Sequence, residues 1–314
     1  MTTRHLVDPE IAPMLDMFPA LEFTAETLPA IRAIFGTPMP DSPAPAIEPE
    51  QLFVQGRNGA PDVRVLIFDP PGRNNQAALL HIHGGGMVMG YTPSNDIANA
   101  ALAVAHGVMI VSVDYRLAPE TPFPGPHEDC MAALDWIVAN ATERGIDPSR
   151  IAVMGDSAGG GLSASVALMA RDEGSVSLRA QFLTYPMLDH RTGTEEQPGL
   201  PYTGEFIWTR PSNRFGWEAL RGDYPCDDAR AGWFSPALAA DLSGLPPTFI
   251  ATGALDLFLE EDLEYVRRLA GAGVPVELHV YPGAFHAFNI MPTAQITQNY
   301  NHDLATAISV MLLA

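Results

Sequence analysis

One short stretch of the chain has the residue types and spacing of a serine nucleophile. Residues 155–159 read Gly-Asp-Ser-Ala-Gly, which matches the pattern G-x-S-x-G. The apolar residues 151–154 before it predict a buried strand, and residues 162–171 after it predict a helix whose N–H groups point toward Ser157. A strand, a sharp turn and a helix are the setting in which this pattern presents a reactive serine. The pattern also occurs in glycine-rich turns with an incidental serine, so Ser157 needs catalytic partners.

A second glycine-rich stretch could supply the electrostatic part of the same chemistry. Residues 83–86 read His-Gly-Gly-Gly and follow a predicted strand at 77–82. Without Cβ atoms, such a loop brings its backbone N–H groups against a substrate carbonyl, where they stabilise a negatively charged oxygen. The N–H of Ala158, the residue after the serine, is expected to complete this oxyanion hole. A merely flexible glycine turn is the simpler alternative, and we expect His83 to orient the loop through hydrogen bonds.

A general base and an acid that orients it are expected at the ends of two later strands. His286 follows a predicted strand at 276–281, and Asp256 follows one at 248–252. Because the carboxyl ends of parallel strands meet at one edge of a sheet, both side chains are expected near Ser157. The chain order serine, aspartate, histidine is the order found in α/β-hydrolases.

Other residues compete for these two roles. His190 and His279 are weaker candidates for the base. Glu260, Glu261 and Asp262 lie close to the predicted acid, but they fall on the start of the next predicted helix. Acidic residues favour that position for structural reasons, because they complement the positive end of the helix.

The elements that must position these residues alternate along the chain. Alternating strands and helices predict an α/β fold with a mostly parallel central sheet and helices on both faces. Ser94 is the expected N-cap of the first of these helices. The predicted strands are 63–68, 77–82, 108–113, 151–154, 179–184, 248–252 and 276–281, and the predicted helices are 94–106, 128–144, 162–171, 259–269 and 293–313.

Two segments depart from this alternation. Residues 1–50 are proline-rich and carry apolar residues at helical spacing, which predicts two short helices. Residues 187–235 interrupt the alternation with loop-forming residues followed by aromatic ones. We expect these to be an N-terminal cap segment and a cap insertion, and residues 51–186 with 236–314 to form the catalytic domain.

Composition excludes several classes of function. The 314 residues carry a net charge of −20, which disfavours nucleic acids and anionic membranes as partners. Cys130 and Cys226 lie far apart without metal-type spacing, so a reducing, cytoplasmic location and no metal site are expected. No apolar run approaches the roughly 18 residues of a membrane span. The sequence is compatible with a homodimer but does not define an oligomeric state.

Taken together, the motifs resemble those of the hormone-sensitive-lipase-like esterases, also called bacterial family IV. Within the matching stretches, Arg116 and Glu120 are expected to tie a turn together beside the site. The stretches are 83–86 (His-Gly-Gly-Gly), 113–120 (Val-Asp-Tyr-Arg-Leu-Ala-Pro-Glu), 155–160 (Gly-Asp-Ser-Ala-Gly-Gly), 235–236 (Ser-Pro), 241–247 (Asp-Leu-Ser-Gly-Leu-Pro-Pro) and 286–288 (His-Ala-Phe).

The resemblance implies an α/β-hydrolase fold with a helical cap and no metal or organic cofactor. It implies that Gly85, Gly86 and Ala158 donate to the oxyanion and that Gly84 shapes the loop. Two features depart from the family pattern. Leu257 and Phe258 follow the acid where the family usually has Pro-Leu, and Met87 stands where the family often has an aromatic residue. The expected substrate-binding residues are Met87, Tyr91, Asp156, Phe206, Ile207 and Trp208.

These features predict a serine carboxylesterase that acts on small-molecule esters with short-to-medium acyl chains. Ser157, Asp256 and His286 are its expected catalytic residues, working through an acyl-serine intermediate. An amide or carbamate hydrolase and an acyltransferase use the same residues and stay open as alternatives. A non-catalytic small-molecule receptor on the same scaffold is a more distant alternative, because such a receptor lacks the base that His286 provides here.

Overall fold

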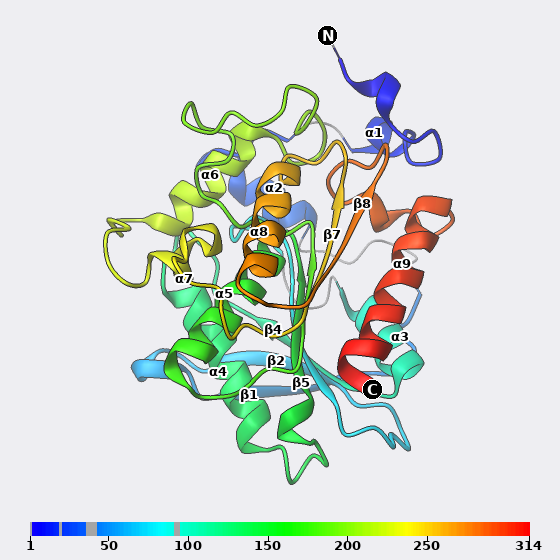
Figure 1. The fold of residues 1–314 in the computed structure, drawn as a ribbon, viewed down its shortest axis with the longest axis vertical. Coiled ribbons are helices and arrows are strands. Elements are labelled where there is room, and N and C mark those ends of the chain that lie inside the picture. Colours follow the sequence, from blue (N-terminus) through cyan, green and yellow to red (C-terminus); the bar gives the residue numbers. More distant parts are fainter. Residues whose placement is uncertain (1, 19–20, 36–42, 91–94) are drawn as a thin grey trace.

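A computed structural model describes residues 2–18, 21–35, 43–90 and 95–314. Eight strands of the described residues form one sheet in the order β1-β2-β4-β3-β5-β6-β7-β8 (Figure 1). The β1–β2 and β2–β4 pairs are antiparallel, and every other neighbouring pair is parallel. The strands are β1 (Glu50–Val54), β2 (Val63–Phe68), β3 (Ala78–Ile82), β4 (Met109–Asp114), β5 (Ile151–Asp156), β6 (Gln181–Thr184), β7 (Thr248–Gly253) and β8 (Val276–Tyr281).

Helices cover both faces of the sheet and bury a separate apolar cluster on each (Figure 1). α3 (Asp96–His106) and α9 (Gln295–Ile308) lie on one face, while α4 (Gly125–Ala139), α5 (Ala158–Glu173) and α8 (Leu259–Gly271) lie on the other. The strands β3 to β6 are buried on both faces, which explains why most of their residues are apolar. The mostly parallel sheet between two helical layers is the predicted arrangement.

Shorter helices complete the chain. The four-residue helices are α1 (Met14–Met17) and α7 (Ala231–Phe234), and α2 (Leu28–Phe35) and α6 (Arg210–Arg221) are longer. Short 3₁₀ helices lie at Arg4–Leu6, Arg57–Gly59, Pro148–Arg150, Pro236–Leu238 and Phe288–Ile290, and a π-helical turn lies at Ser309–Leu313. Among the described residues, no helix is both long enough and apolar enough to cross a membrane.

The helix after the serine is longer than predicted. It begins at Ala158, so its first turn consists largely of glycines that the sequence reading left outside the helix. Packing explains them. A Cβ at Gly159 would run into the carbonyl oxygen of Ile82, and one at Gly161 would run into that of Met187. Glycine weakens a helix, but here it lets the helix approach the neighbouring backbone closely.

Several other boundaries differ from the predictions. β1 was not predicted, because its side chains are mostly exposed and Phe53 is 63% accessible on an edge strand. The helix predicted at 128–144 begins at Gly125 and ends at Ala139, and the side-chain amide of the following Asn140 donates to the Trp136 carbonyl. The final predicted helix changes to π-helical geometry after Ile308. Ser94, the expected N-cap of α3, lies outside the described residues.

The N-terminal segment packs against the insertion between β6 and β7. α2 and α6 lie near one another at one end of the sheet (Figure 1). The ring of Phe23 contacts Trp208 edge-on at 5.2 Å between centroids and lies 6.4 Å from Phe215. The two predicted helices of the N-terminal segment correspond to α1 and α2. Two segments far apart in sequence therefore share one apolar contact.

Candidate active site

Ser157 occupies a strained turn between β5 and α5. Its φ of 55° and ψ of −120° lie where a non-glycine residue rarely stays unless the surrounding structure holds it there. The two flanking glycines make the turn possible, because a Cβ at Gly155 would overlap the backbone of Gly159. Ser157 is 6% exposed, so little of its surface is open to solvent.

A short hydrogen-bond relay links three residues from three strand ends. The Oγ atom of Ser157 lies 2.9 Å from Nε2 of His286, and Nδ1 of the same ring lies 2.9 Å from Oδ2 of Asp256. Asp256 is fully buried, and its other oxygen accepts the backbone N–H of Phe258 at 3.0 Å. With Nδ1 donating to the carboxylate, Nε2 is left free to accept the serine proton.

The competing bases lie elsewhere. The ring of His190 packs 5.5 Å from that of Phe234, and His279 on β8 bonds Glu277 through Nε2 at 2.8 Å. Glu261 instead accepts the backbone N–H of Leu188 at 2.6 Å. None of the hydrogen bonds described for these residues reaches the relay at the serine.

The His-Gly-Gly-Gly loop presses against the serine turn. A Cβ at Gly84 would come within 2.9 Å of the Asp156 carbonyl oxygen and 3.5 Å of the Ser157 Cβ. Gly85 has φ +116° and Gly86 has φ +62°, so the backbone follows a path that suits glycine. A Cβ at Gly86 would also collide with the indole ring of Trp208. The loop therefore carries its N–H groups close to the start of α5, where Ala158 is fully buried.

His83 supports this loop as predicted from the sequence. Its Nδ1 lies 2.8 Å from the Gly84 carbonyl oxygen, and its ring stacks on Tyr115 with centroids 4.2 Å apart. The Tyr115 hydroxyl in turn donates to the His83 carbonyl at 2.9 Å. Burial lowers the pKa of His83, which keeps the ring neutral. A neutral ring can donate at Nδ1 without adding a positive charge beside the site.

Three aromatic rings surround the imidazole of His286, and of these the sequence analysis had assigned only Trp208 to the site. Tyr185 lies 4.7 Å away between centroids, Phe258 meets the imidazole edge-on at 5.2 Å, and Trp208 lies at 6.4 Å. The available signal was position, since Tyr185 directly follows β6 and Phe258 is two residues past the acid. These rings pack around the imidazole, and His286 is 5% exposed.

The predicted substrate-binding residues fall into different environments. Trp208 is buried over Gly86, and its indole N–H donates to Asn213 at 3.1 Å. Met87 is 1% exposed with φ +61°, while Phe206 and Ile207 are half-buried. Tyr91 lies outside the described residues.

Asp156 ends β5 directly before the serine and is half-buried. Burial raises the pKa of its carboxyl to about 6, and the nearby His286 opposes this rise. Its charge is also felt by Tyr185 and Tyr300, whose own pKa values are raised mainly by burial. Asp156 therefore lies within electrostatic reach of the base.

The turn expected between Arg116 and Glu120 is built differently. Arg116 pairs with the fully buried Asp129, with its NH2 group 2.7 Å from Oδ1. Glu120 pairs instead with Arg32 of α2 at 2.7 Å, and the same guanidinium donates to the Val88 carbonyl. The two residues therefore do not pair with each other: Arg116 binds α4 through Asp129, and Glu120 binds α2 through Arg32.

The described residues contain no group of histidine, cysteine, aspartate and glutamate side chains arranged to hold a metal ion.

Comparison with known protein families shows which family the chain belongs to. A family described as having the α/β-hydrolase fold matches residues 79–290, a span that includes the oxyanion loop, the serine, the acid and the base. The chain belongs to this family. The resemblance to the hormone-sensitive-lipase-like esterases and the predicted fold are both confirmed.

Curated and solved relatives agree with this placement. Carboxylesterase NlhH of Mycobacterium tuberculosis is 36% identical over 299 residues, which cover 90% of this chain and 88% of the relative. Esterase LipI of the same species is 33% identical over 310 residues, covering 93% and 92%. A solved bacterial heroin esterase has a TM-score of 0.91 and 40% identity, with 99% of each chain covered. The predicted enzyme class, a serine carboxylesterase, is confirmed by these relatives.

Proposed function

We propose that the enzyme hydrolyses short-to-medium acyl esters through Ser157, with His286 as the base and Asp256 as the orienting acid. The observation that carries the proposal is the continuous relay of 2.9 Å contacts from Oγ through the imidazole to the carboxylate. A nucleophile, its base and the group that orients the base are in hydrogen-bond reach without rearrangement.

The first half of the reaction transfers the acyl group to the serine. Oγ of Ser157 attacks the ester carbonyl carbon while Nε2 of His286 takes the hydroxyl proton. Asp256 stabilises the imidazolium that forms. The imidazolium then donates its proton to the leaving alkoxide, and the alcohol departs from the acyl-enzyme. In the second half a water molecule gives its proton to His286, attacks the acyl carbon and releases the carboxylic acid as the serine regains its proton.

The negative charge on the carbonyl oxygen develops in the transition state, where backbone donors stabilise it. We propose the N–H groups of Gly85, Gly86 and Ala158 as these donors, with Gly84 shaping the loop. Loss of one such donor typically slows catalysis by a factor of about 10² to 10³. The close contact of the loop with the serine turn supports this assignment.

We propose that residues 1–50 and 187–235 form a cap over a catalytic domain made of 51–186 and 236–314. The contact between Phe23 and Trp208 supports a common unit, and Trp208 lies against Gly86 of the oxyanion loop. A large indole at this point limits the room for an acyl chain. The preference for short-to-medium acyl groups follows from that limit.

The test uses p-nitrophenyl esters from acetyl to palmitoyl, with heroin added because a similar protein is named for it. We expect kcat/KM to be highest for short-to-medium chains, and Ser157→Ala to reduce turnover to background. Ser165→Ala removes another buried serine hydroxyl, which donates to the Gly161 carbonyl, and is expected to retain activity. Normal ester turnover by Ser157→Ala with an unchanged circular dichroism spectrum would overturn the proposal. Matched amides and an added alcohol acceptor separate ester hydrolysis from the alternatives with the same catalytic residues.

The location and assembly of the enzyme are also proposals. A reducing, cytoplasmic environment is supported by the free thiols of Cys130, which is buried, and Cys226, which is half-buried. A homodimer is tested by light scattering of the purified chain.

A further inference from the structure

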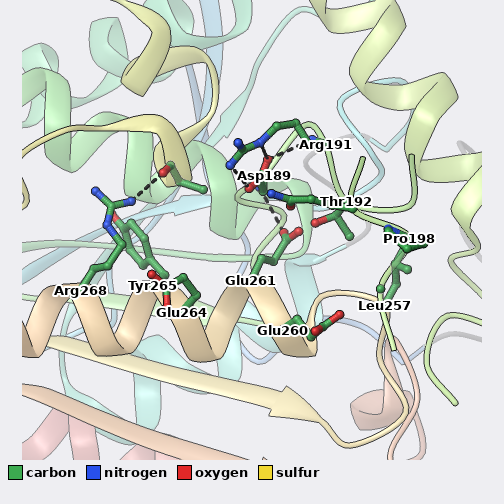
Figure 2. A pocket seen from close by; sticks show the side chains of 13 residues that line it. Asp189, Arg191, Thr192, Pro198, Leu257, Glu260, Glu261, Glu264, Tyr265 and Arg268 are labelled. Atoms are coloured by element: carbon green, nitrogen blue, oxygen red, sulfur yellow. Dashed lines mark hydrogen bonds and ion pairs between the residues drawn. The ribbon is translucent and has the colours of Figure 1, made fainter. Parts of the chain in front are cut away.

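A cavity of about 650 Å³ lies between α8 and the loop that opens the insertion after β6 (Figure 2). Its lining includes neither Ser157 nor His286, and its link to the relay is Leu257, the neighbour of Asp256. Ligand pockets of proteins typically measure about 300–1,000 Å³, so this cavity can hold a small organic molecule.

Most charged groups around the cavity already have partners. The carboxylate of Asp189 accepts two hydrogen bonds from the Arg191 guanidinium, from Nε at 2.9 Å and from NH2 at 2.7 Å. Arg268 directs its guanidinium at the carbonyl oxygens of Ala237 and Ala239. Glu264 pairs with Arg267 on the outer side of α8. The cations of the lining are therefore engaged, whereas the carboxylates are in excess.

Glu261 is the exception, and it is buried. Only 7% of its surface is exposed. Its Oε1 accepts the backbone N–H groups of Leu188 at 2.6 Å and Asp189 at 3.3 Å, whereas Oε2 has no hydrogen-bond partner among the described residues. Figure 2 shows the carboxyl directed away from α8, toward the loop with Asp189 and Thr192. The hydroxyl of Tyr265, one turn further along α8, is also buried without a partner in the described chain.

The chemistry of the lining defines what would complete it. An acceptor oxygen that is buried and lacks a donor calls for a ligand with N–H or O–H groups. Four carboxyl groups line the cavity (Asp189, Glu260, Glu261, Glu264) against two guanidinium groups (Arg191, Arg268), which favours a positive ligand. Apolar surface comes from Leu257, Pro198 and Ala237.

We propose that this cavity is a second binding site, separate from the catalytic relay, for an organic ammonium ion. Its ammonium group donates to Oε2 of Glu261, and its hydrocarbon part lies against Leu257 and Pro198. The exposed carboxylate of Glu260 lies next in the chain and adds to the attraction.

Binding is coupled to the release of a proton. Burial and then the charge of Asp189 raise the pKa of Glu261, while the two backbone N–H groups that donate to Oε1 lower it. Arg191 lines the cavity from the loop that carries Asp189. The other charged groups of α8 itself are Glu260, Asp262, Glu264, Arg267 and Arg268. Protonated Glu261 gives up its proton when the ammonium ion binds, so the complex gains no net charge. Affinity is therefore expected to rise with pH until Glu261 is ionised in the free protein.

The test is calorimetric titration of the whole chain with n-hexylammonium chloride at pH 7. The wild type is expected to bind one equivalent, more tightly at pH 8 than at pH 6. Titrations in buffers of different ionisation enthalpy are expected to show proton release. The neutral probe 1-hexanol is expected to bind at least tenfold more weakly, since it has the same chain but lacks the charge.

Glu261→Gln is the decisive variant. Glutamine keeps the acceptor for the Leu188 and Asp189 N–H groups but removes the charge, and at least tenfold weaker binding is expected. Glu218→Gln makes the same charge change at an exposed position of α6 outside the cavity, and unchanged affinity is expected. Equal affinity of Glu261→Gln and wild type for hexylammonium would overturn the proposal. That result is expected if the probe binds near Ser157 and not in the cavity. Equal losses in both variants would also overturn it, because only the net charge of −20 would then act. If Glu261→Gln fails to fold, absence of proton release in the wild type refutes the site.

Discussion

At the residue scale, the carboxylate of Asp256 has no exposed surface and is held by two hydrogen bonds. Asp256 accepts the imidazole at 2.9 Å through one oxygen and the Phe258 N–H at 3.0 Å through the other. The hydrogen bond from the Phe258 N–H holds the carboxylate in place independently of the imidazole. The Leu257 that departs from the family pattern leaves this turn intact, because the donor is the backbone of the next residue.

Asp256→Asn is expected to reduce kcat by about 10⁴-fold, as in other catalytic triads, because an amide donor favours the wrong imidazole tautomer. Stopped-flow or steady-state hydrolysis of p-nitrophenyl butyrate measures this loss. Asp303→Asn is the matched control, since Asp303 lies 3.3 Å from the competing His279 and should change kcat little. A larger loss in Asp303→Asn than in Asp256→Asn would mean that the acid is assigned wrongly.

Asp156 is expected to make the rate depend on pH in a way that Asp156→Asn abolishes. Burial raises the pKa of Asp156 to about 6, so the carboxyl is neutral at pH 5 and negative at pH 8. The negative form stabilises the imidazolium of the transition state. The ratio of wild-type to variant kcat should therefore be near one at pH 5 and rise several-fold by pH 8. A ratio that stays constant over this range contradicts the electrostatic role.

Sequence patterns indicated residues that the structure brings together, but not the rings that enclose them. Ser157 and His286, whose Oγ and Nε2 atoms lie 2.9 Å apart, could be singled out because a turn motif marks one and a strand end the other. Tyr185 could not, because its ring meets that of His286 at 4.7 Å only in the folded chain, although the two residues are far apart in sequence. Packing partners of this kind leave no local pattern.

At the scale of elements, one side chain of the insertion between β6 and β7 contacts three separate segments. Trp208 contacts the N-terminal segment through Phe23, the oxyanion loop at Gly86 and its own insertion through Asn213. The sequence indicated an aromatic cluster in the insertion. It did not indicate which ring lies over the loop, because that depends on how the insertion folds back.

Trp208→Ala is expected to move the kcat/KM profile toward longer acyl chains, since it removes the ring that lies against Gly86. A pocket methylene is worth roughly 1–3 kcal/mol in such a profile, which makes a shift between acetyl, butyryl and octanoyl esters measurable. Phe206→Ala and Ile207→Ala are compared with it, because both residues are only half-buried. Because truncating a buried tryptophan costs about 3–5 kcal/mol, circular dichroism must first show that the variant is folded.

If all three variants are folded and keep the wild-type chain-length profile, the insertion acts only as a structural cover. Acyl preference would then be sought around Met87, whose buried side chain follows the oxyanion loop.

At the scale of the whole molecule, the fold could be predicted where both faces of a strand are buried and less well at the edges. β5 and β7 were predicted to within two residues, because continuous apolar sequence leaves few alternatives. β1 was not predicted, because it is an edge strand and most of its side chains are exposed to water, which leaves no buried apolar pattern in its sequence. The antiparallel β2 could be predicted as a strand, but its direction depends on the connection and not on its own sequence.

A second feature of the whole molecule is that two acidic residues of α8 are buried in a chain of charge −20. Asp262 is fully buried, and neither of its carboxyl oxygens has a hydrogen-bond partner among the described residues. Burial, then the charge of Glu261, raises the pKa of Asp262 well above its usual range. The folded protein therefore retains a proton on Asp262 that the unfolded chain releases above about pH 4.

Asp262→Asn is expected to stabilise the enzyme increasingly as the pH rises. The native state binds one proton more than the unfolded state, so the wild-type contribution of Asp262 to the free energy of unfolding falls with pH from about 4 until the raised native pKa is passed. Asparagine resembles the neutral acid in shape and does not titrate. Urea unfolding at pH 5 and pH 8 should show the variant gaining on the wild type by up to about 1.4 kcal/mol per pH unit. Glu264→Gln is the control, because Arg267 lowers the pKa of Glu264 and its effect should be constant between these two pH values. A stability difference between Asp262→Asn and wild type that does not grow with pH would mean that Asp262 is ionised in the folded protein, and that its charge must then be balanced by a group not yet identified.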